Sequence, residues 1–200
     1  MTDINLVLHG LAIKKHASAA DVAGLLGLEE TAVAETLDAA AEKGRVAGTK
    51  GKYTLTPTAR VTLKSAYGRM FADQRKDQTF LDAYERFEAV NKDLKQVITD
   101  WQVMTVGGKS VTNDHSDKDY DAGVIGRLGD VHERVEGVLD ALAQSLPRLS
   151  IYKDKLEAAL EKAEDGDIQW VSDAACESYH TVWFELHEDL LRITGNKRED

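Results

Sequence analysis

The sequence predicts a mainly α fold, in which N-terminal helices with one short β-hairpin are followed by an antiparallel helical bundle. Three observations lead to this prediction. Apolar residues recur at helical spacing through most of the chain. Only 2 of the 200 residues are proline, so long helices are permitted almost everywhere. The hydrophobic share of 42% is large enough for a buried core, which a disordered chain would lack.

Cysteine content and hydropathy limit the environment of the protein. The single cysteine, Cys176, excludes an intramolecular disulfide framework and a cysteine-rich zinc site. No apolar run approaches the roughly 18 residues that a membrane-spanning helix needs. The first residues lack the basic-then-apolar order of a signal peptide. We therefore expect a soluble, cytoplasmic protein that has no membrane partner.

Charge divides the chain into two parts. There are 25 Lys and Arg against 35 Asp and Glu, which gives a formal net charge of −10. Residues 1–65 carry a net charge of +1, whereas residues 66–200 carry −11. This asymmetry predicts a nearly neutral domain at 1–65 and an acidic helical domain at 66–200, with different roles. The total charge argues against a basic nucleic-acid coat but leaves room for a small DNA-reading head.

Three helices are expected at the start of the first domain. Helical spacing indicates helices at about 3–15, 18–27 and 29–43, with Ser18 as a cap and Gly27 as a stop. The inward positions of the third helix are expected to be Val33, Leu37 and Ala41. These short amphipathic helices can enclose a small core of their own.

A hairpin and a fourth helix complete this domain. Two short strands surround the turn at Lys50-Gly51-Lys52, and Thr56-Pro57 then opens a helix, with Thr as its cap. The order helix, helix, helix, hairpin, helix resembles the winged helix-turn-helix domain of bacterial regulators. The segments that carry the resemblance are Ser18–Gly27, the exit Lys43–Val46 and Tyr53–Pro57. The resemblance covers less than a third of the chain and implies a winged-helix fold.

The resemblance also implies DNA binding, with the third helix in the major groove and the hairpin tip at phosphate. The residues expected to contact DNA are Lys14, Lys15, Thr31, Arg45, Lys50 and Lys52. The third helix suits this role poorly, because Glu30, Glu35 and Asp38 are among its expected outward positions. These positions hold no Arg, Asn or Gln that could bond base edges. A winged helix that docks a protein or forms a dimer is therefore the alternative.

Heptad-like series predict the second domain. Mostly apolar residues alternate in steps of four and three along segments that start at Phe80, Val124 and Cys176. Asn91 is the one polar member of the first series. Such seams are typical of long helices that pack at shallow angles in left-handed bundles. A shorter helix is expected at about 148–164.

A segment rich in Gly and Asp separates the first two of these helices. Thr105–Ser116, which contains Gly107-Gly108, is the expected linker. Aspartates at positions 117, 119 and 121 suggest a calcium loop, but the EF-hand pattern then fails at two positions. An acidic helix start that Ser116 caps is therefore the expected structure.

Histidines and aromatic residues supply the candidate ligand or partner site of the second domain. The candidates are His115, His132, Tyr179, His180, Trp183 and His187. His180 and His187 lie two helical turns apart, about 10 Å along the axis, which is too far for both to bind one metal ion directly. A pocket of three histidines that includes His132 is one interpretation, and hydrogen-bonded interior histidines are the other. We assign no metal, no cofactor and no catalytic residue, because the chain has no phosphate loop, nucleophile elbow or paired carboxylates.

Three functions are compatible with these patterns. The first is a DNA-binding transcriptional regulator whose helical domain forms a homodimer or senses a small molecule. A homodimer would place its two winged helices on half-sites about one DNA turn apart. The second is a non-catalytic accessory or interaction protein whose winged helix docks a protein partner. Leu11–Arg60 resembles helical modules appended to some bacterial phosphoenolpyruvate-utilising enzymes, which implies such an enzyme as that partner. The third is a helical bundle that binds a metal or small ligand through its histidines.

Overall fold

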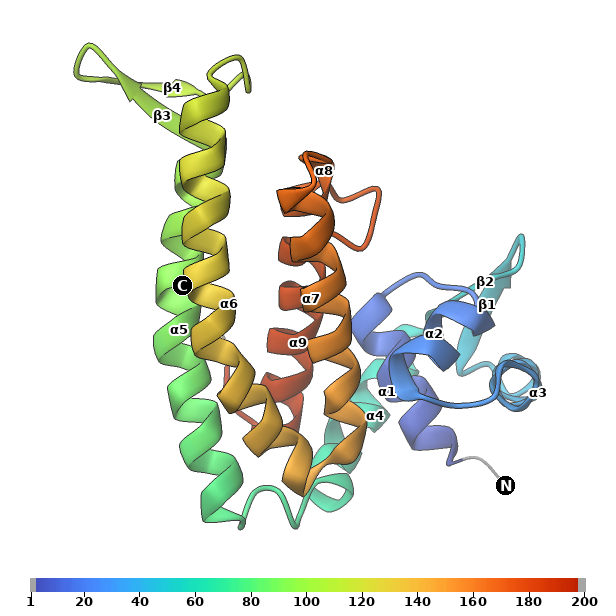
Figure 1. Ribbon diagram of the computed structural model, residues 1–200. Helices are drawn as coiled ribbons and strands as arrows, with labels where there is room; N and C mark the ends of the chain where they lie inside the picture. The colour runs from blue at the N-terminus through green and yellow to red at the C-terminus, as the bar shows by residue number, and fades with distance from the viewer. Residues whose placement is uncertain (1–2, 198–200) are drawn as a thin grey trace. The chain divides into compact units, whose positions relative to one another are not determined.

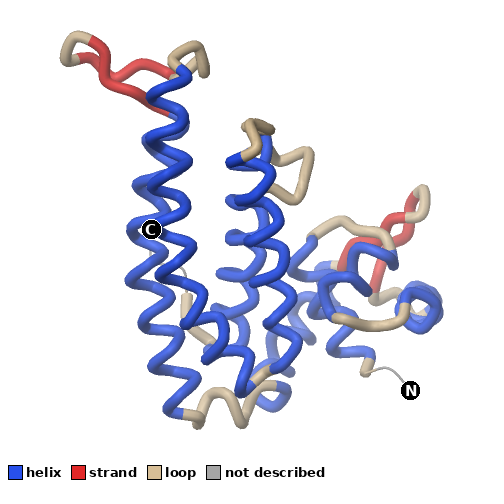
Figure 2. The backbone as a smooth tube through the Cα atoms, in the orientation of Figure 1, coloured by secondary structure: helices blue, strands red, loops and turns tan. Residues whose placement is uncertain are grey.

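The computed structural model describes residues 3–197 and shows a mainly helical protein with two small antiparallel hairpins (Figure 1, Figure 2). The prediction of a mainly α protein is confirmed. The helices are α1 (Ile4–Lys14), α2 (Ala19–Leu26), α3 (Glu30–Glu42), α4 (Pro57–Met70), α5 (Gln78–Gln102), α6 (Lys118–Ser145), α7 (Ser150–Glu164), α8 (Gln169–Ser172) and α9 (Tyr179–Thr194), with a short 3₁₀ helix η1 (Pro147–Leu149). The strands are β1 (Val46–Thr49), β2 (Lys52–Leu55), β3 (Val103–Val106) and β4 (Lys109–Thr112). None of the helices within residues 3–197 is long and apolar enough to cross a membrane.

The chain folds into two compact units. The first unit contains the chain up to Lys76 and again from His187 onward. The second unit contains Asp77–Leu186. Helix α9 therefore contributes its first residues to the second unit and its last residues to the first.

Local signals set the helix ends of the first unit. The Ser18 hydroxyl accepts a hydrogen bond from the backbone N–H of Asp21, whose carboxylate accepts one from the backbone N–H of Ser18. Gly27 ends α2 in the left-handed conformation, with φ 65°. Helix α4 begins with Pro57 after the cap residue Thr56. The expected roles of Ser18, Gly27 and Thr56 are thus confirmed.

The β1–β2 hairpin is tied to its surroundings by Tyr53. The Tyr53 N–H donates to the carbonyl of Ala17 at 2.7 Å, and the Ala17 N–H donates back to Tyr53 at 3.1 Å. This single bridge joins the hairpin to the connection between α1 and α2. The Tyr53 hydroxyl also donates to Asp38 on α3 at 2.6 Å. The hairpin, α3 and the α1–α2 connection therefore hold one another in place.

Helix α3 packs against α1 and α2 through its buried residues Val33, Leu37 and Ala40. The expectation that Ala41 faces inward is wrong, because Ala40 is fully buried whereas Ala41 is half-buried. Residues three and four positions after Leu37 lie on the same helical face, and here the residue three positions later, Ala40, is the one that packs inward.

The second unit is built on the predicted seams. Helices α5 and α6 pack against each other, and α7 packs against α6 (Figure 1). Every member of the two seams that start at Phe80 and Val124 is buried, including the polar Asn91. The seam positions were therefore predicted correctly from spacing alone.

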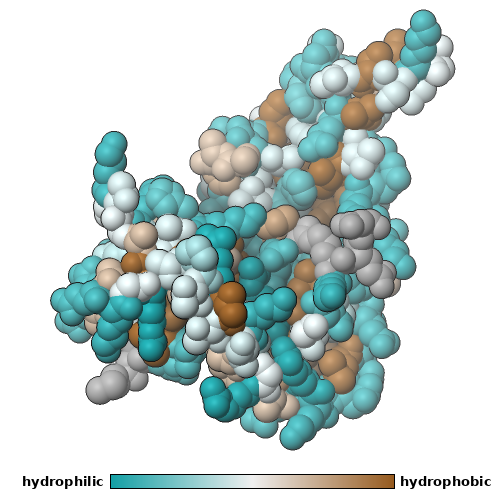
Figure 3. Space-filling view, turned by 180° about the vertical axis from the view of Figure 1, so that it is seen from behind, coloured by the Kyte–Doolittle hydropathy of each residue, from teal (hydrophilic) through white to brown (hydrophobic). Residues whose placement is uncertain are grey.

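A second hairpin stands where the sequence predicted a linker. Strands β3 and β4 pair antiparallel, with Val106 opposite Lys109 around the turn at Gly107-Gly108. Both glycines have positive φ, 58° and 79°, which suits a tight two-residue hairpin turn. Val106 and Val111 are 55% and 40% exposed, and Figure 3 shows hydrophobic surface on the projecting hairpin. The linker prediction is wrong because a Gly-Gly pair between β-branched residues is also a hairpin signal.

Helix α9 begins later than predicted and is buried on nearly all sides. It starts at Tyr179, so Cys176, the expected first seam member, lies outside the helix and is half-buried. Most side chains of α9 are buried, and these include the ionisable residues Glu185, His187 and Asp189. An ionisable group inside a protein needs a partner, because burial without one is costly.

Candidate functional site

The predicted phosphate contacts at the β1–β2 turn are exposed. Lys50 (φ 52°) and Gly51 (φ 75°) form the turn, and Lys52 begins β2. Figure 3 shows that the tip of this hairpin projects as a hydrophilic surface. The pKa of Asp21 is lowered mainly by the backbone hydrogen bond at Ser18, and the charges of Lys14 and Lys52 add to this effect. Lys14 and Lys52 therefore lie near the start of α2.

The other predicted DNA contacts are spread over several elements. Lys15 follows α1 with a positive φ of 67° and is exposed. Arg45 is exposed between α3 and β1. Thr31 is exposed in the first turn of α3. Of these residues, only Thr31 lies on the helix that would have to read base edges.

The outer face of α3 is acidic. Glu30, Glu35, Asp38 and Glu42 are exposed, and α3 contains no basic residue. Asp38 accepts the hydrogen bond from the Tyr53 hydroxyl, and this bond is the main reason that the pKa of Tyr53 is raised. The carboxylates thus stand on a helix that the hairpin holds rigidly.

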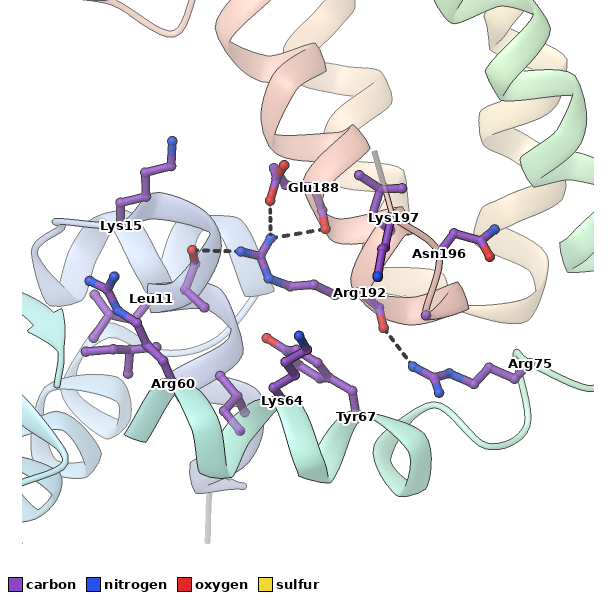
Figure 4. Close-up of a pocket in the computed structure, with 15 residues that line it drawn as sticks. Leu11, Lys15, Arg60, Lys64, Tyr67, Arg75, Glu188, Arg192, Asn196 and Lys197 are labelled. Atoms are coloured by element: carbon purple, nitrogen blue, oxygen red, sulfur yellow. Dashed lines mark hydrogen bonds and ion pairs between the residues drawn. The ribbon is translucent and has the colours of Figure 1, made fainter. Parts of the chain in front are cut away.

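A different surface of the first unit forms a pocket with a volume of about 730 Å³. Helices α1, α4 and α9 line it, and Figure 4 shows their side chains around the hollow. The basic residues of its wall are Lys15, Arg60, Lys64, Arg75, Arg192 and Lys197. Its apolar residues include Leu11, Leu55, Leu63 and Leu191. The size and the mixture of apolar and polar walls are typical of small-molecule sites.

Arg75 and Arg192 build this wall. The Nε of Arg75 donates to the carbonyl of Ile193 at 2.7 Å, and one of its terminal nitrogens donates to the carbonyl of Arg192 at 3.1 Å. These bonds satisfy carbonyls in the last turn of α9, which have no partner inside the helix. Arg192 pairs with Glu188 at 2.8 Å and donates to the carbonyl of Ala12 at 3.4 Å. Glu188, the one carboxylate among the pocket residues that the structure describes, is therefore already neutralised.

A buried polar chain leads inward from the pocket. Tyr67 lines the pocket, and its hydroxyl lies 3.3 Å from Nδ1 of His9. The Nε2 of His9 lies 2.9 Å from a carboxylate oxygen of Asp189, and both side chains are fully buried. An ionised carboxylate can only accept, so the Nε2–H of His9 donates to Asp189. Nδ1 of a neutral His9 then accepts from Tyr67.

Three of the candidates of the predicted bundle, His132, Tyr179 and Trp183, form a separate buried cluster. Nδ1 of His132 lies 3.2 Å from the Tyr179 hydroxyl, and Nε1 of Trp183 donates to the Asn91 side chain at 2.9 Å. Trp183 also stacks on Phe87 at 5.0 Å. Burial lowers the pKa of His132 and raises the pKa of Tyr179. Each polar group here has a protein partner, as an interior network requires.

The three histidines of the proposed metal pocket have different surroundings. His132 contacts Tyr179, His180 contacts the Ser172 hydroxyl at 3.3 Å, and His187 belongs to the first unit. Within residues 3–197, no three His, Cys, Asp or Glu side chains come together as ligands for a metal ion.

His115 closes the base of the β3–β4 hairpin. Its Nδ1 lies 3.1 Å from the buried carboxylate of Asp121, and its ring packs on Trp101 at 4.4 Å. The side-chain amide of Asn113 donates to the same carboxylate at 2.9 Å. The predicted acidic start of α6 is present, but its cap is Asp117 instead of Ser116. The carboxylate of Asp117 accepts the hydrogen bond from the backbone N–H of Tyr120, so the hydroxyl of Ser116 is not needed as a cap.

Comparison of the chain with protein-family models, with curated proteins and with solved structures gave no match in any of the three. A functional proposal therefore depends on the residues and contacts of this chain.

The residues of this site that were not predicted from the sequence include His9, Asp189, Arg60 and Lys64. His9 and Asp189 are 180 residues apart, so no local pattern connects them. One available signal was the pair of positions 60 and 64, because two cations at i and i+4 share one helical face. The other was Asp189 itself, a carboxylate next to Leu190, which the seam of this helix predicts to be buried.

Proposed function

We propose that the chain is a non-catalytic interaction protein whose winged helix, formed by α1–α4 with β1–β2, docks a protein partner that carries a basic segment. The observation that supports this most strongly is the acidic outer face of α3. In a winged helix this is the helix that meets the bound macromolecule.

The carboxylates of α3 form a line. Glu35, Asp38 and Glu42 follow one another in steps of three and four, which places them on one exposed face. Like charges at these spacings cost a helix about 0.2–0.5 kcal/mol per pair. A basic partner segment relieves this repulsion, whereas a DNA backbone adds to it. Small residues between the carboxylates, such as Ala34 and Ala39, leave space for long Lys and Arg side chains.

DNA binding is the second candidate, and the hairpin tip favours it. Lys50 and Lys52 are exposed at the turn, where a wing reaches phosphate. In that function the helical second unit supplies the dimer contacts or senses an effector. Two lysines predict that the affinity for DNA falls only weakly as salt rises, since each phosphate contact adds about one to the slope of the logarithm of the binding constant against the logarithm of the salt concentration.

Fluorescence anisotropy with two labelled probes separates these candidates. One probe is a 20-residue peptide of alternating Lys and Ala, and the other is a 20-base-pair duplex. The variant E35Q/E42Q removes two carboxylates from α3 and keeps Asp38 for Tyr53. Its matched control, E133Q/E161Q, removes two exposed carboxylates from the second unit. We expect the peptide to bind, and E35Q/E42Q to weaken binding while the control does not.

Two results would contradict the proposal. Equal weakening by both variants would mean that the peptide follows the net charge of the chain and does not recognise α3. Binding of the duplex that K50A/K52A abolishes, with E35Q/E42Q binding the duplex more tightly than the wild type, would establish the second candidate instead.

A further inference from the structure

We infer that the pocket between α1, α4 and α9 of the first unit binds an amphipathic organic anion, that is, a carboxylate or phosphate head on an apolar body. This inference is independent of the macromolecule that α3 contacts, because α3 contributes no residue to the pocket.

The charge of the pocket is the first argument. Among the described residues that line it, Glu188 is the only one with a carboxylate, and it is paired with Arg192 at 2.8 Å. Arg60 and Lys64 stand on the same face of α4, one helical turn apart, and repel each other. Within residues 3–197 neither side chain forms a hydrogen bond or an ion pair. An anion between these two cations gains charge-assisted hydrogen bonds without breaking any existing one.

The fixed part of the wall is the second argument. Arg75 and Arg192 are held by the carbonyls of Ile193, Glu188 and Ala12. Arg75 therefore keeps its charge at a fixed position in the wall, whereas the charge of Arg192 is compensated by Glu188. Figure 4 shows Arg60 and Lys64 projecting from α4 on the side of this helix on which Arg192 lies. A preorganised group of cations binds an anion with a smaller entropy cost than mobile side chains do.

The apolar lining decides what the rest of the ligand must be. Leu11, Leu63 and Leu191 are buried residues whose side chains still reach the pocket wall. The apolar surface that remains open lies on the edges of Leu63 and Leu191 and on the aliphatic stems of the basic side chains of the wall; a bare inorganic ion leaves it in contact with water, whereas an apolar body covers it and gains the hydrophobic contribution. Because the volume of about 730 Å³ far exceeds that of a single ion, a ligand with an aromatic or branched aliphatic body fits best.

Isothermal titration calorimetry on the full chain tests the inference with four probes. They are 2-naphthyl phosphate, 2-naphthoate, 2-naphthylmethylamine and inorganic phosphate. The first two have the expected head and body, the third reverses the head charge, and the fourth lacks the body. We expect one site for at least one naphthyl anion, weaker or absent binding of the amine, and weaker binding of inorganic phosphate.

Two variants test whether the binding heat that calorimetry measures comes from this pocket. R60A/K64A removes two unpaired cations of the pocket wall, and K92A/K95A makes the same charge change with exposed lysines of α5. Loss of two charge-assisted contacts predicts at least about a tenfold increase in Kd for R60A/K64A and no change for the control. All four side chains are exposed, so both variants are expected to keep the wild-type circular dichroism spectrum.

The inference fails if none of the probes binds, or if the amine binds as tightly as the anions. It also fails if inorganic phosphate binds as tightly as 2-naphthyl phosphate, because the apolar lining then contributes nothing. Equal affinities of R60A/K64A and K92A/K95A would place the binding outside this pocket. None of these results depends on peptide or DNA binding by α3, so failure here leaves the proposed function untouched.

Discussion

Two buried histidine–tyrosine pairs, one in each unit, have nearly the same geometry and different surroundings. In the first unit, Nδ1 of His9 lies 3.3 Å from the Tyr67 hydroxyl, with the rings edge to face at 5.4 Å. In the second unit, the corresponding values for His132 and Tyr179 are 3.2 Å and 5.8 Å. The difference lies at the other ring nitrogen. The Nε2 of His9 is bonded to the fully buried carboxylate of Asp189. In the part of the chain that the structure describes, His132 has no such partner to offset the cost of burial, and burial lowers its pKa.

The same histidine–tyrosine hydrogen bond therefore has a different role in each unit. The carboxylate of Asp189 commits His9 to a fixed orientation, because the Nε2–H must donate to it. The His9–Tyr67 bond then holds a tyrosine at the wall of the pocket. In the second unit, no carboxylate among the described residues forms a hydrogen bond to the ring of His132, and the pair supports the aromatic stack around Trp183. The pair is a positioning element in the first unit and a packing element in the second.

The largest expected effect is that of Asp189→Ala. Asp189→Ala leaves the buried Nε2–H of neutral His9 without an acceptor and opens a cavity, and the two effects together cost about 3 kcal/mol of unfolding free energy. Urea denaturation followed by circular dichroism measures this loss, and hydrogen exchange should locate it in α1, where His9 lies. Asp189→Asn is the matched control, since its amide oxygen can still accept from Nε2 of His9. A cost as large for Asn as for Ala would mean that the charge of Asp189, and not its hydrogen bond, is what matters.

Replacing each tyrosine by phenylalanine compares the two pairs directly. An orphaned polar partner in the interior costs about 1–3 kcal/mol. Tyr179 is fully buried, so Tyr179→Phe should cost an amount near the upper end of this range. Tyr67 borders the pocket, where water can replace its hydroxyl, so Tyr67→Phe should cost less. Chemical denaturation of both variants against the wild type gives the order, and a larger cost for Tyr67→Phe would contradict it.

A smaller, graded effect is expected from pH. Burial is the main reason that the pKa of His132 in the folded protein is below its ordinary value of 6.5. The unfolded chain therefore takes up this proton more readily, and the unfolding free energy should fall as pH drops below about 6.5. The fall ends once the pH is below the folded-state pKa. His132→Gln should show a weaker dependence in this interval, measured by urea denaturation at a series of pH values. An unchanged dependence would assign it to other groups.

Local chemistry made much of this fold predictable. The reciprocal bonds of Ser18 and Asp21, the left-handed Gly27 and the Thr56-Pro57 start are interactions between residues a few positions apart. The buried seams of α5 and α6 follow from helical periodicity, which burial on one face imposes on the sequence. Even Asn91 was correctly placed in the seam, although its partner, Trp183, was not foreseen.

Long-range pairings were not predictable in the same way. The chain from His187 onward joins the first unit, and nothing near this point in the sequence indicates that grouping. The pocket also depends on it, because α9 supplies Arg192 and Leu191 to a wall whose other parts come from α1 and α4. Periodicity reports that a face is buried and does not report what covers it.

The smallest expected effect concerns the residue next to Asp189. Glu188 also forms an ion pair, with Arg192 at 2.8 Å, but both side chains are more than a fifth exposed. Water screens such a pair, so Glu188→Gln should lower the unfolding free energy by only about 0.3–0.5 kcal/mol. Urea denaturation at low and high salt measures this, and the difference from the wild type should shrink as salt rises. A cost that approaches that of Asp189→Ala would mean that the wall of the pocket is as tightly built as the buried chain behind it. A small cost would mean that the backbone carbonyls are enough to hold Arg192 in place once the carboxylate is gone. The charge of Arg192 is then no longer compensated, so the same variant should bind 2-naphthyl phosphate more tightly than the wild type does.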